Sequence, residues 1–302
     1  MQNQASMTAL MSAFGRAYHA EHEPHPVFRD TLARALMTDE EYAAIGAHLL
    51  AGLDFFAPER KDLFRSDTSV LQWLLNTQIA PTPLCRAAYC EAALQTAMRT
   101  GTQQYAILGA GLDTFAFRNP EFLKKFRVFE VDHPKTQEDK RARIAHAGWQ
   151  EPAQLSFVGV DFTKDDLAAQ LLSAGFDPKK KTFFSWLGVS YYLYRSEIEA
   201  MLDALHALCA DGSTLLFDYA DEGLFTSRYP RVQKMVALAQ AAGEPMRACF
   251  DALSLDQMLA AHGFLVYEQL DPAAIQREII APSGAPLCAF EHIHYVQAVC
   301  KM

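Results

Sequence analysis

A short apolar segment that runs into a glycine-rich turn is the first feature of the sequence that could bind a ligand. The segment spans residues 105–108, and the turn that follows contains Gly109, Ala110, Gly111 and Asp113. The two glycines let the backbone bend sharply and approach a ligand closely. Thr114 stands where dinucleotide-binding turns carry their third glycine, and Asp113 would repel a pyrophosphate. The turn therefore favours a cofactor without phosphate groups.

Two further apolar segments end in acidic residues. Asp132 lies 21 residues after Gly111, the spacing at which a carboxylate at the end of the second strand accepts hydrogen bonds from ribose hydroxyls. Asp161 ends the next segment and precedes Phe162, so its carboxylate could accept from an exocyclic amine while the ring packs on an adenine. Each aspartate alone could be a helix cap. Acids after three successive strands indicate a ligand site, because open α/β sheets bind ligands at the carboxyl ends of their strands.

A parallel sheet is needed to position these residues. After Gly101 the sequence contains seven short apolar runs separated by helical stretches, at residues 104–108, 127–131, 155–160, 182–187, 214–219, 264–267 and 292–299. Most of these runs are continuously apolar, which is typical of strands that are covered on both faces. The pattern predicts an α/β fold with a doubly wound, seven-stranded, mostly parallel, Rossmann-like sheet.

The regions outside this alternation are predicted to be helical. Residues 1–100 contain no convincing strand, so we expect a helical N-terminal cap followed by a main domain at 101–302. The segment 221–253 interrupts the alternation and is predicted to be a helical insertion beside the cap.

Local signals predict where individual helices begin. Thr38 with Glu41, Ser196 with Glu199 and Ser254 with Gln257 have the spacing of capping boxes. A further helix is expected over residues 84–99, between a proline-rich start and a glycine stop.

Composition excludes several classes of partner. The chain has 302 residues and a net charge of -9, so it offers no basic surface for nucleic acid or for an anionic membrane. Its six cysteines show no C-x-x-C pair, and they are predicted to be reduced thiols. No apolar run approaches the 18 residues of a membrane span, and the N-terminus has no signal-peptide pattern. A cytoplasmic protein is the expectation, and the oligomeric state is left open.

The motifs taken together resemble the leucine carboxyl methyltransferase-like branch of class I S-adenosylmethionine-dependent methyltransferases. The matching segments are residues 107–118, 129–134, 160–162 and 184–193, with residues 15–17 and 28–30 similar to the N-terminal signature. The resemblance implies the class I methyltransferase fold and S-adenosylmethionine as cofactor. It also implies that Asp132 binds the ribose, that Asp161 and Phe162 contact the adenine, and that Gly109 and Gly111 line the methionine portion.

Further cofactor contacts follow from the same resemblance. Ala110, Asp113 and Leu187 are counted among the cofactor-binding residues. Arg86 matches an arginine that binds the cofactor carboxylate, with a solvated helix arginine as the alternative. Many members carry Glu-Gly at the end of the fourth strand, whereas this chain has Leu187-Gly188. Backbone carbonyls or another side chain must then replace the glutamate, and the substrate of the members that methylate protein phosphatases is not carried over.

Two tyrosines that follow strands are the candidates for the acceptor side. Tyr192 and Tyr219 could each direct a hydroxyl at the acceptor, or could simply pack under the cap. We expect the acceptor pocket between the cap and the 221–253 insertion, with both tyrosines on its wall. Arg16, Arg118 and Tyr192 are the candidate donors to a bound carboxylate.

The predicted reaction is O-methylation of a carboxylate on a small or peptide-like acceptor. The sequence offers no clear general base, and a carboxylate is already ionised at neutral pH, whereas a phenol would benefit from a base. Phenol O-methylation in secondary metabolism and a non-catalytic cofactor-binding protein remain alternatives. A nicotinamide-dependent oxidoreductase is disfavoured by Asp113 and Thr114. His19, His22 and His25 are regularly spaced, but Pro24 and Pro26 break their helical face, so no metal site is expected.

Overall fold

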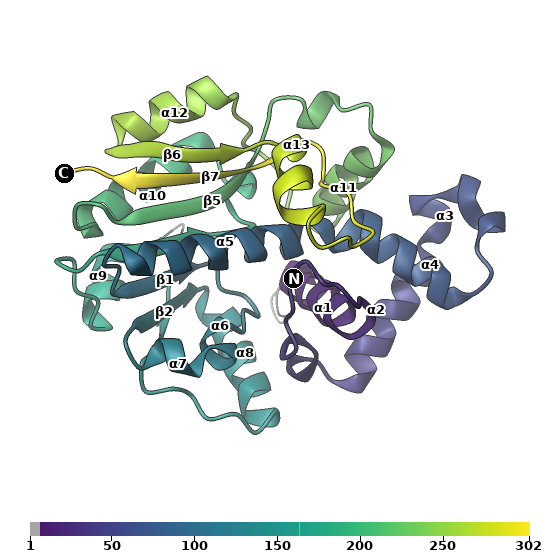
Figure 1. Ribbon diagram of the computed structural model, residues 1–302, viewed down its shortest axis with the longest axis horizontal. Helices are drawn as coiled ribbons and strands as arrows, with labels where there is room; N and C mark the ends of the chain where they lie inside the picture. The colour runs from purple at the N-terminus through teal and green to yellow at the C-terminus, as the bar shows by residue number, and fades with distance from the viewer. Residues whose placement is uncertain (1–6, 163) are drawn as a thin grey trace.

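One seven-stranded sheet organises the computed structural model, which describes residues 7–162 and 164–302 (Figure 1). The strands are β1 (Gln104–Leu108), β2 (Arg127–Asp132), β3 (Leu155–Gly159), β4 (Thr182–Trp186), β5 (Thr214–Ala220), β6 (Phe264–Leu270) and β7 (Ile293–Cys300). Their order in the sheet is β3-β2-β1-β4-β5-β7-β6, and only β7 runs antiparallel to its neighbours. The predicted seven-stranded, mostly parallel, doubly wound sheet is confirmed. The strand order reverses between β1 and β4, which is where such sheets open a crevice for a ligand.

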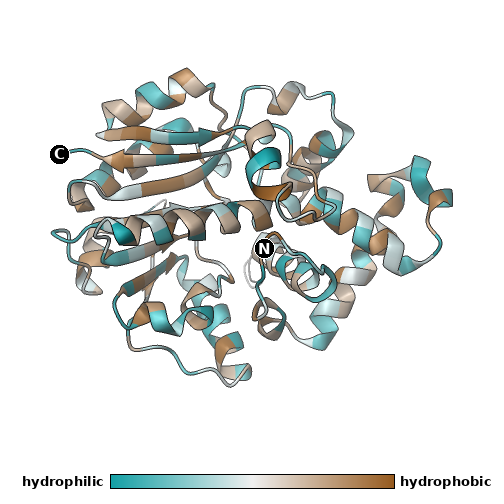
Figure 2. Ribbon diagram, in the orientation of Figure 1, coloured by the Kyte–Doolittle hydropathy of each residue, from teal (hydrophilic) through white to brown (hydrophobic). Residues whose placement is uncertain are grey.

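Helices cover both faces of the sheet, and this explains why the strands are continuously apolar. Ala106 and Leu108 of β1 pack on the face covered by α9 (Leu167–Ser173), α10 (Arg195–Leu208) and α12 (Ala252–Ala261). The alternate residues Tyr105 and Ile107 pack on the opposite face against α5 (Pro81–Arg99). Figure 2 shows that the strands are largely hydrophobic, whereas the outer helices also carry hydrophilic residues.

Between residue 7 and β1, the described chain forms helices and helical turns joined by loops. It contains α1 (Met7–His22), η1 (Ala33–Leu36), α2 (Asp39–Ala51), α3 (Leu53–Phe56), η2 (Pro58–Leu63), α4 (Asp67–Leu74), the π-helical turn η3 (Leu75–Ile79) and α5. Helices α1, α2 and α4 share an apolar cluster of their own. Helix α5 packs directly on the sheet through residues such as Ala93 and Leu94, so it belongs to the sheet layer as well as to the helical lead-in.

The insertion is helical only in part. It contains η5 (Leu224–Thr226) and α11 (Pro230–Ala241), and residues 242–251 then return without regular secondary structure. Figure 1 shows α1, α2 and α11 beyond the carboxyl ends of the parallel strands.

The remaining elements are one longer helix, α8, and several short helical segments. They are α6 (Phe115–Arg118), α7 (Pro120–Leu123), α8 (Pro134–His146), η4 (Ser190–Tyr192), α13 (Pro272–Ile275) and the π-helical turn η6 (Gln276–Ile280). Within the described ranges, none of the helices combines the length and the apolar composition that crossing a bilayer requires.

The helix-start predictions are confirmed at one site and wrong at two. Thr38 and Glu41 form the reciprocal capping box that begins α2. Helix α10 instead begins after Tyr194, whose backbone amide donates to Glu197 at 2.7 Å. Helix α12 begins after Asp251, whose carboxylate accepts from the amides of Leu253 and Ser254. An acidic cap that accepts two amide hydrogen bonds starts the helix three residues before the predicted serine.

Candidate active site

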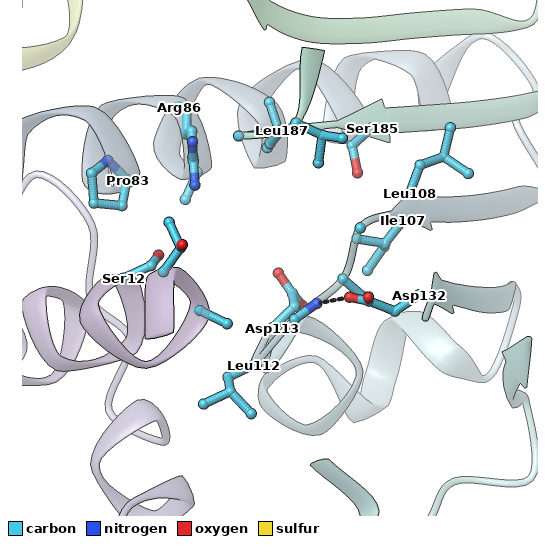
Figure 3. Close-up of a pocket in the computed structure, with 18 of the residues that line it drawn as sticks. Ser12, Pro83, Arg86, Ile107, Leu108, Leu112, Asp113, Asp132, Ser185 and Leu187 are labelled. Atoms are coloured by element: carbon cyan, nitrogen blue, oxygen red, sulfur yellow. Dashed lines mark hydrogen bonds between the residues drawn. The ribbon is translucent and has the colours of Figure 1, made fainter. Parts of the chain in front are cut away.

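A cavity of about 460 Å³ lies at the carboxyl ends of β1, β2 and β4 (Figure 3). This size falls within the range of small-molecule sites. The sheet supplies the glycine-rich turn, Asp132 and Leu187, whereas α5 supplies Pro83 and Arg86. Helix α1 and the loop at 243–247 complete the wall. The cavity therefore lies between the sheet, the N-terminal helices and the insertion.

The glycine-rich turn brings bare backbone to the cavity. Gly109 has a φ of +73° and Gly111 a φ of +49°, which is the left-handed region that glycine tolerates best. A Cβ atom on Gly109 would lie 2.6 Å from Cγ2 of Val189, so no larger residue fits there without displacing Val189. The carboxylate of Asp113 accepts from the amide of Phe115 at 2.6 Å and so caps α6. Ala110 and Asp113 also line the cavity.

Asp132 ends β2 and directs its carboxylate toward this turn (Figure 3). Its Oδ2 accepts from the amide of Gly111 at 2.6 Å, and its Oδ1 accepts from the amide of His133 at 2.7 Å. Burial raises the pKa of Asp132, and the two amide hydrogen bonds oppose that rise. Because each carboxylate oxygen can accept about two hydrogen bonds, Asp132 keeps capacity for donors on a ligand.

Arg86 points from α5 into the cavity (Figure 3). Its Nη1 lies 3.1 Å from Oδ2 of the fully buried Asp218 and 3.2 Å from the hydroxyl of Tyr191. Burial opposes the charge of Arg86, but Asp218 holds its pKa above the usual value. The other oxygen of Asp218 accepts from the amide of Gly188 at 2.6 Å. The guanidinium is therefore fixed in place, and its Nη1 satisfies Asp218 while other donors of the group remain for a ligand.

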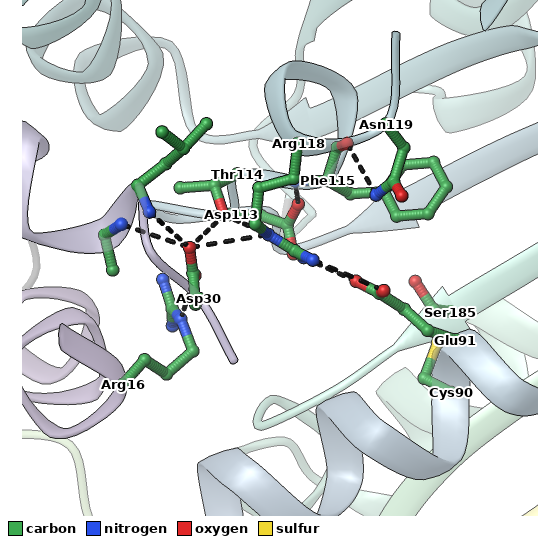
Figure 4. Close-up of polar contacts among 12 residues, drawn as sticks. Arg16, Asp30, Cys90, Glu91, Asp113, Thr114, Phe115, Arg118, Asn119 and Ser185 are labelled. Carbon is green, nitrogen blue, oxygen red and sulfur yellow. Dashed lines mark hydrogen bonds and ion pairs between the residues drawn. The ribbon is translucent and has the colours of Figure 1, made fainter. Parts of the chain in front are cut away.

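A cluster of opposite charges forms the cap side of the cavity (Figure 4). The buried carboxylate of Asp30 lies 2.9 Å from Nε of Arg16 and 3.4 Å from Nε of Arg118, and it accepts from the hydroxyl of Thr114 at 2.7 Å. Arg118 also pairs with Glu91. Arg16 and Arg118 were candidate donors to an acceptor, and the structure shows both engaged with carboxylates of the protein itself.

The hydroxyl of Tyr192 is placed differently from these engaged groups. Tyr192 is half-buried, follows β4 in η4 and lines the cavity. Among the described residues, none forms a hydrogen bond with its hydroxyl. Burial raises the pKa of Tyr192 to about 12, so the hydroxyl is protonated and available as a donor at neutral pH. Its neighbour Tyr191 is instead hydrogen-bonded to Arg86.

Tyr219 lies away from the cavity, in contrast to the expectation. It is 1% exposed, its ring stacks on His294 at 5.1 Å between centroids, and it does not line the cavity. Successive side chains of a strand point to opposite faces. Since Asp218 faces Arg86, Tyr219 must face the apolar layer on the other side of the sheet.

Of the two predicted adenine contacts, only one lines the cavity. Phe162 lines the cavity together with Ala110 and Leu187. Asp161 is not among the lining residues, and its carboxylate pairs with Lys164 at 2.6 Å. Its role in binding adenine stays a prediction.

The three regularly spaced histidines do not form a metal centre. His19 is buried, its Nε2 accepts from the amide of Val27 at 3.1 Å, and burial lowers its pKa to about 4. No group of three or more metal-ligating side chains occurs in the part of the chain that the structure describes.

Sequence reasoning missed two residues that shape the cavity. Asp218 organises Arg86 and Gly188, and Ser12 brings a hydroxyl from α1 (Figure 3). Asp218 is an acidic residue within an otherwise apolar run, and this was the available signal. For Ser12 we find no local signal, because a serine within a helix has nothing that marks it as a site residue.

Known proteins that are similar to this chain carry methyltransferase descriptions, which agrees with a cofactor cavity at the carboxyl ends of the strands. A family model described as leucine carboxyl methyltransferase matches residues 9–206. YktD of Bacillus subtilis, which is provisionally named as an S-adenosyl-L-methionine-dependent methyltransferase, is 42% identical over 303 residues, with 99% of each chain covered. A protein of Mycobacteroides abscessus with the same provisional description is 27% identical over 304 residues, covering 96% of this chain and 93% of that one.

Solved structures support the fold at lower sequence identity. A protein from Thermobifida fusca, provisionally described as a methyltransferase, superimposes with a TM-score of 0.56 at 15% identity, over 99% of this chain and 96% of that one. A DUF574 family protein from Streptomyces avermitilis gives a TM-score of 0.55 at 14% identity, over 84% and 97% of the two chains. The family match and the full-length similarity to YktD show that the chain belongs to the leucine carboxyl methyltransferase family of S-adenosylmethionine-dependent methyltransferases.

Proposed function

We propose that the protein methylates a carboxylate oxygen of a small or peptide-like acid, with S-adenosylmethionine as the methyl donor. The observation that carries this proposal is the chemistry of the cavity wall. Neither histidine nor lysine occurs among the described residues that line it. The wall offers a protonated tyrosine hydroxyl to an acceptor and no ready general base.

Each acidic group that lines the wall has at least one hydrogen-bond or ion-pair partner within the protein, and Asp113, Asp132 and Glu244 keep further acceptor capacity. Asp30 is paired with two arginines, and Asp113 and Asp132 accept from backbone amides. Glu244, from the loop after α11, accepts a hydrogen bond from the hydroxyl of Thr8. A phenol, whose pKa is near 10, would need one of these groups to take its proton, whereas a carboxylate arrives ionised.

The sheet side of the cavity fits the cofactor. The spare acceptor capacity of Asp132 suits the ribose hydroxyls, the ring of Phe162 suits the adenine, and Arg86 suits the carboxylate. Gly109 and Gly111 let the backbone approach closely, and a Cβ at Gly109 would fill the space that Val189 occupies. Most of these residues belong to the sheet and the turns that follow its strands, and Arg86 comes from α5.

When bound, S-adenosylmethionine supplies a methyl group on a positively charged sulfur: the acceptor oxygen forms the new O–C bond, the S–C bond breaks, and its electron pair remains on sulfur. No proton moves in this step. The protein's task is therefore to hold the acceptor oxygen in line, and such positioning can supply about 7–11 kcal/mol of the barrier. The hydroxyl of Tyr192 is suited to this task, because it can donate to one carboxylate oxygen and leave the other to react.

The test is the nature of the product. The purified protein is incubated with S-adenosylmethionine and a panel of carboxylic acids and phenols, and formation of S-adenosylhomocysteine is followed. We expect a base-labile methyl ester, and a rate that does not fall through acceptor protonation until the pH approaches about 4. A base-stable ether with a rate that rises toward pH 10 would replace this proposal with phenol methylation. Tight cofactor binding with no turnover of any acceptor would favour a non-catalytic protein.

A further inference from the structure

A second chamber, of about 160 Å³, lies beside the cofactor cavity and shares part of its wall. The shared residues include Arg86, Gly188 and Tyr192. The rest of the chamber is enclosed by four separate parts of the chain, namely α1, η3 with the start of α5, α11 with the loop that follows it, and the start of β7. Anything bound in this chamber would adjoin the cavity at Tyr192.

The wall of the chamber is largely apolar and adaptable. Met11 from α1, Met235 from α11 and Met246 from the following loop line it, together with Ile79 and Ile293. Methionine side chains are flexible and polarisable, so they fit apolar groups of varied shape. Arg86 is the one charged residue among the described residues that line the chamber. A second charge on an occupant would lose its hydration there and find no charged partner among the described residues other than Arg86, although Gln78 and Thr82 add polar side chains to the wall.

The backbone at η3 supports a ligand-binding role for this chamber. Residues Leu75–Ile79 form a π-helical turn, and the turn carries Gln78 and Ile79 into the chamber wall. Turns of π-helix are rare and are frequent at functional sites.

The charged side of the chamber is the wall that it shares with the cofactor cavity. Tyr192 and Arg86 lie on that wall, whereas Met235, Met246 and Ile293 line only the chamber, together with the polar Gln78 and Thr82. A carboxylate would therefore lie at the shared wall, where the unbonded Tyr192 hydroxyl can donate to it. An attached apolar body would extend among the methionines.

The volume of the chamber indicates the approximate size of the part of an occupant that it can cover. One bound water needs about 10–15 Å³ of cavity volume. The 160 Å³ of the chamber therefore holds on the order of ten non-hydrogen atoms. A straight-chain acid with eight carbons, octanoate, is of this size.

We infer that this methionine-lined chamber is the acceptor site and that it selects a free monocarboxylic acid with an apolar body of roughly eight carbons. The inference rests on the proposed function, since it names the substrate class of the same reaction. The carboxylate faces Tyr192, and the apolar body packs against Met11, Met235 and Met246.

Chain length provides the first test. Straight-chain monocarboxylates from four to twelve carbons are compared with the wild-type protein and S-adenosylmethionine. We expect kcat/KM to rise about fourfold for each methylene group until octanoate, and then to level off or fall. Octanedioate, which would place a second carboxylate among the methionines, should be at least about tenfold poorer than octanoate. A flat profile, or a preference for a peptide carboxyl terminus over octanoate, would overturn the inference.

Filling the chamber provides the second test. Met235→Trp should raise KM for octanoate at least about tenfold, raise KM for butanoate much less, and leave the dissociation constant of S-adenosylmethionine unchanged. Leu238→Trp is the matched control, because Leu238 lies on the same helix, is 43% exposed and lines neither cavity. Met11→Trp fills the opposite wall and serves if the first variant does not fold. An unchanged KM for octanoate in a folded filling variant contradicts the inference.

Binding separates this inference from the reaction on which it rests. Octanoate is titrated by calorimetry into the wild-type and Met235→Trp proteins in the presence of S-adenosylhomocysteine. If no acid is esterified but octanoate binds the wild type and not the variant, the chamber assignment stands and the proposed reaction fails. If octanoate does not bind the wild type, the chamber assignment fails whatever the reaction.

Discussion

The two walls of the cofactor cavity hold their carboxylates in opposite ways. On the sheet wall, Asp132 is contacted by the backbone amides of Gly111 and His133. On the cap wall, Asp30 is contacted by the guanidinium groups of Arg16 and Arg118 and by a hydroxyl (Figure 4). Both carboxylates are largely withdrawn from solvent and line the same cavity, yet of the two only Asp30 forms ion pairs with the described residues.

The pKa directions of the two groups follow from this difference. Burial raises the pKa of Asp132, and amide hydrogen bonds only partly offset it. Burial also acts to raise the pKa of Asp30, but Arg16, Arg118 and Thr114 together hold it below its usual value. A buried carboxylate whose charge is balanced by groups of the protein has a structural role. Here Asp30 holds α1 and the loop that follows it against α6. A buried carboxylate without such balance is suited to a ligand that brings donors and positive charge.

The largest effect is expected from breaking the cap wall. Asp30→Asn leaves two buried guanidinium groups without their shared carboxylate, and loss of one partner from a buried pair typically costs about 3–5 kcal/mol. We expect the free energy of unfolding in denaturant to fall by about that amount. Asp39→Asn is the control, because Asp39 also pairs with an arginine but its side chain is 90% exposed. Its effect should stay below about 1 kcal/mol. Equal losses in both variants would mean that the Asp30 cluster has no special structural role.

The next effect concerns the sheet wall. Asp132→Ala removes the acceptor of the ribose hydroxyls, and each hydrogen bond to a charged group contributes about 1.5–3 kcal/mol. We expect the dissociation constant of S-adenosylmethionine, measured by calorimetry, to rise tenfold or more while the protein stays folded. Asp161→Ala should have a smaller effect, because Asp161 pairs with Lys164 and does not line the cavity. A comparable loss in both variants would restore the adenine contact that the sequence predicted for Asp161.

A smaller effect is expected at the junction of the cavity and the chamber. Tyr192→Phe removes one donor from a half-buried position, so kcat/KM for the acceptor acid should fall about tenfold. The dissociation constant of S-adenosylmethionine should not change. Phenylalanine keeps the packing of the ring, and Tyr194→Phe tests a neighbouring hydroxyl that lines neither cavity. A Tyr192→Phe protein with unchanged kinetics toward the acid would leave the acceptor without an identified donor.

The sheet wall was readable from the sequence because its residues are local. Each strand is buried on both faces and bounded by turns, so its apolar run is visible, and Asp132 follows its strand directly. The glycine turn and Phe162 are likewise carried by single short motifs. These features depend on the path of the backbone over a few residues.

The sequence predicted an acceptor pocket between the cap and the 221–253 insertion, but not the side-chain pairs of the cap wall or most residues of the chamber, because distant segments build them. Arg86 meets Asp218 across 132 residues, and Arg118 meets Asp30 across the junction of cap and sheet. Tyr192 and Tyr219 looked equivalent in the sequence, but strand alternation turned Tyr219 into the core. The helix starts at α10 and α12 were misplaced for a different, local reason: a nearby acidic residue supplied the hydrogen bonds that the predicted box was expected to make.

The smallest effect concerns the pH dependence of cofactor binding, which distinguishes the two carboxylates without breaking either wall. Asp132 is a stronger acceptor for the ribose hydroxyls when it is ionised, and burial raises its pKa. As the pH falls, affinity for S-adenosylmethionine should therefore decline before an ordinary aspartate would be protonated, whereas Asp30, with its lowered pKa, stays ionised in the same range.

One neighbouring group must be separated from Asp132 in that experiment. Glu130 is buried beside Lys140, and burial raises its pKa to about 7. Affinity is therefore measured by calorimetry from pH 8 downward in the wild type, in Glu130→Gln and in Asp132→Ala. We expect the acid-side decline to persist in Glu130→Gln and to vanish from the weak binding of Asp132→Ala.

The free energy of unfolding of the free protein should depend on pH in the opposite direction. A group whose pKa is higher in the folded than in the unfolded protein stabilises the fold below the unfolded pKa, and this contribution is lost as the pH rises through the folded pKa. The Asp132→Asn protein should therefore be slightly more stable than the wild type at neutral pH and not at acidic pH. A decline that disappears in Glu130→Gln would assign the titration to the Glu130–Lys140 pair and remove Asp132 as the group that links pH to cofactor binding.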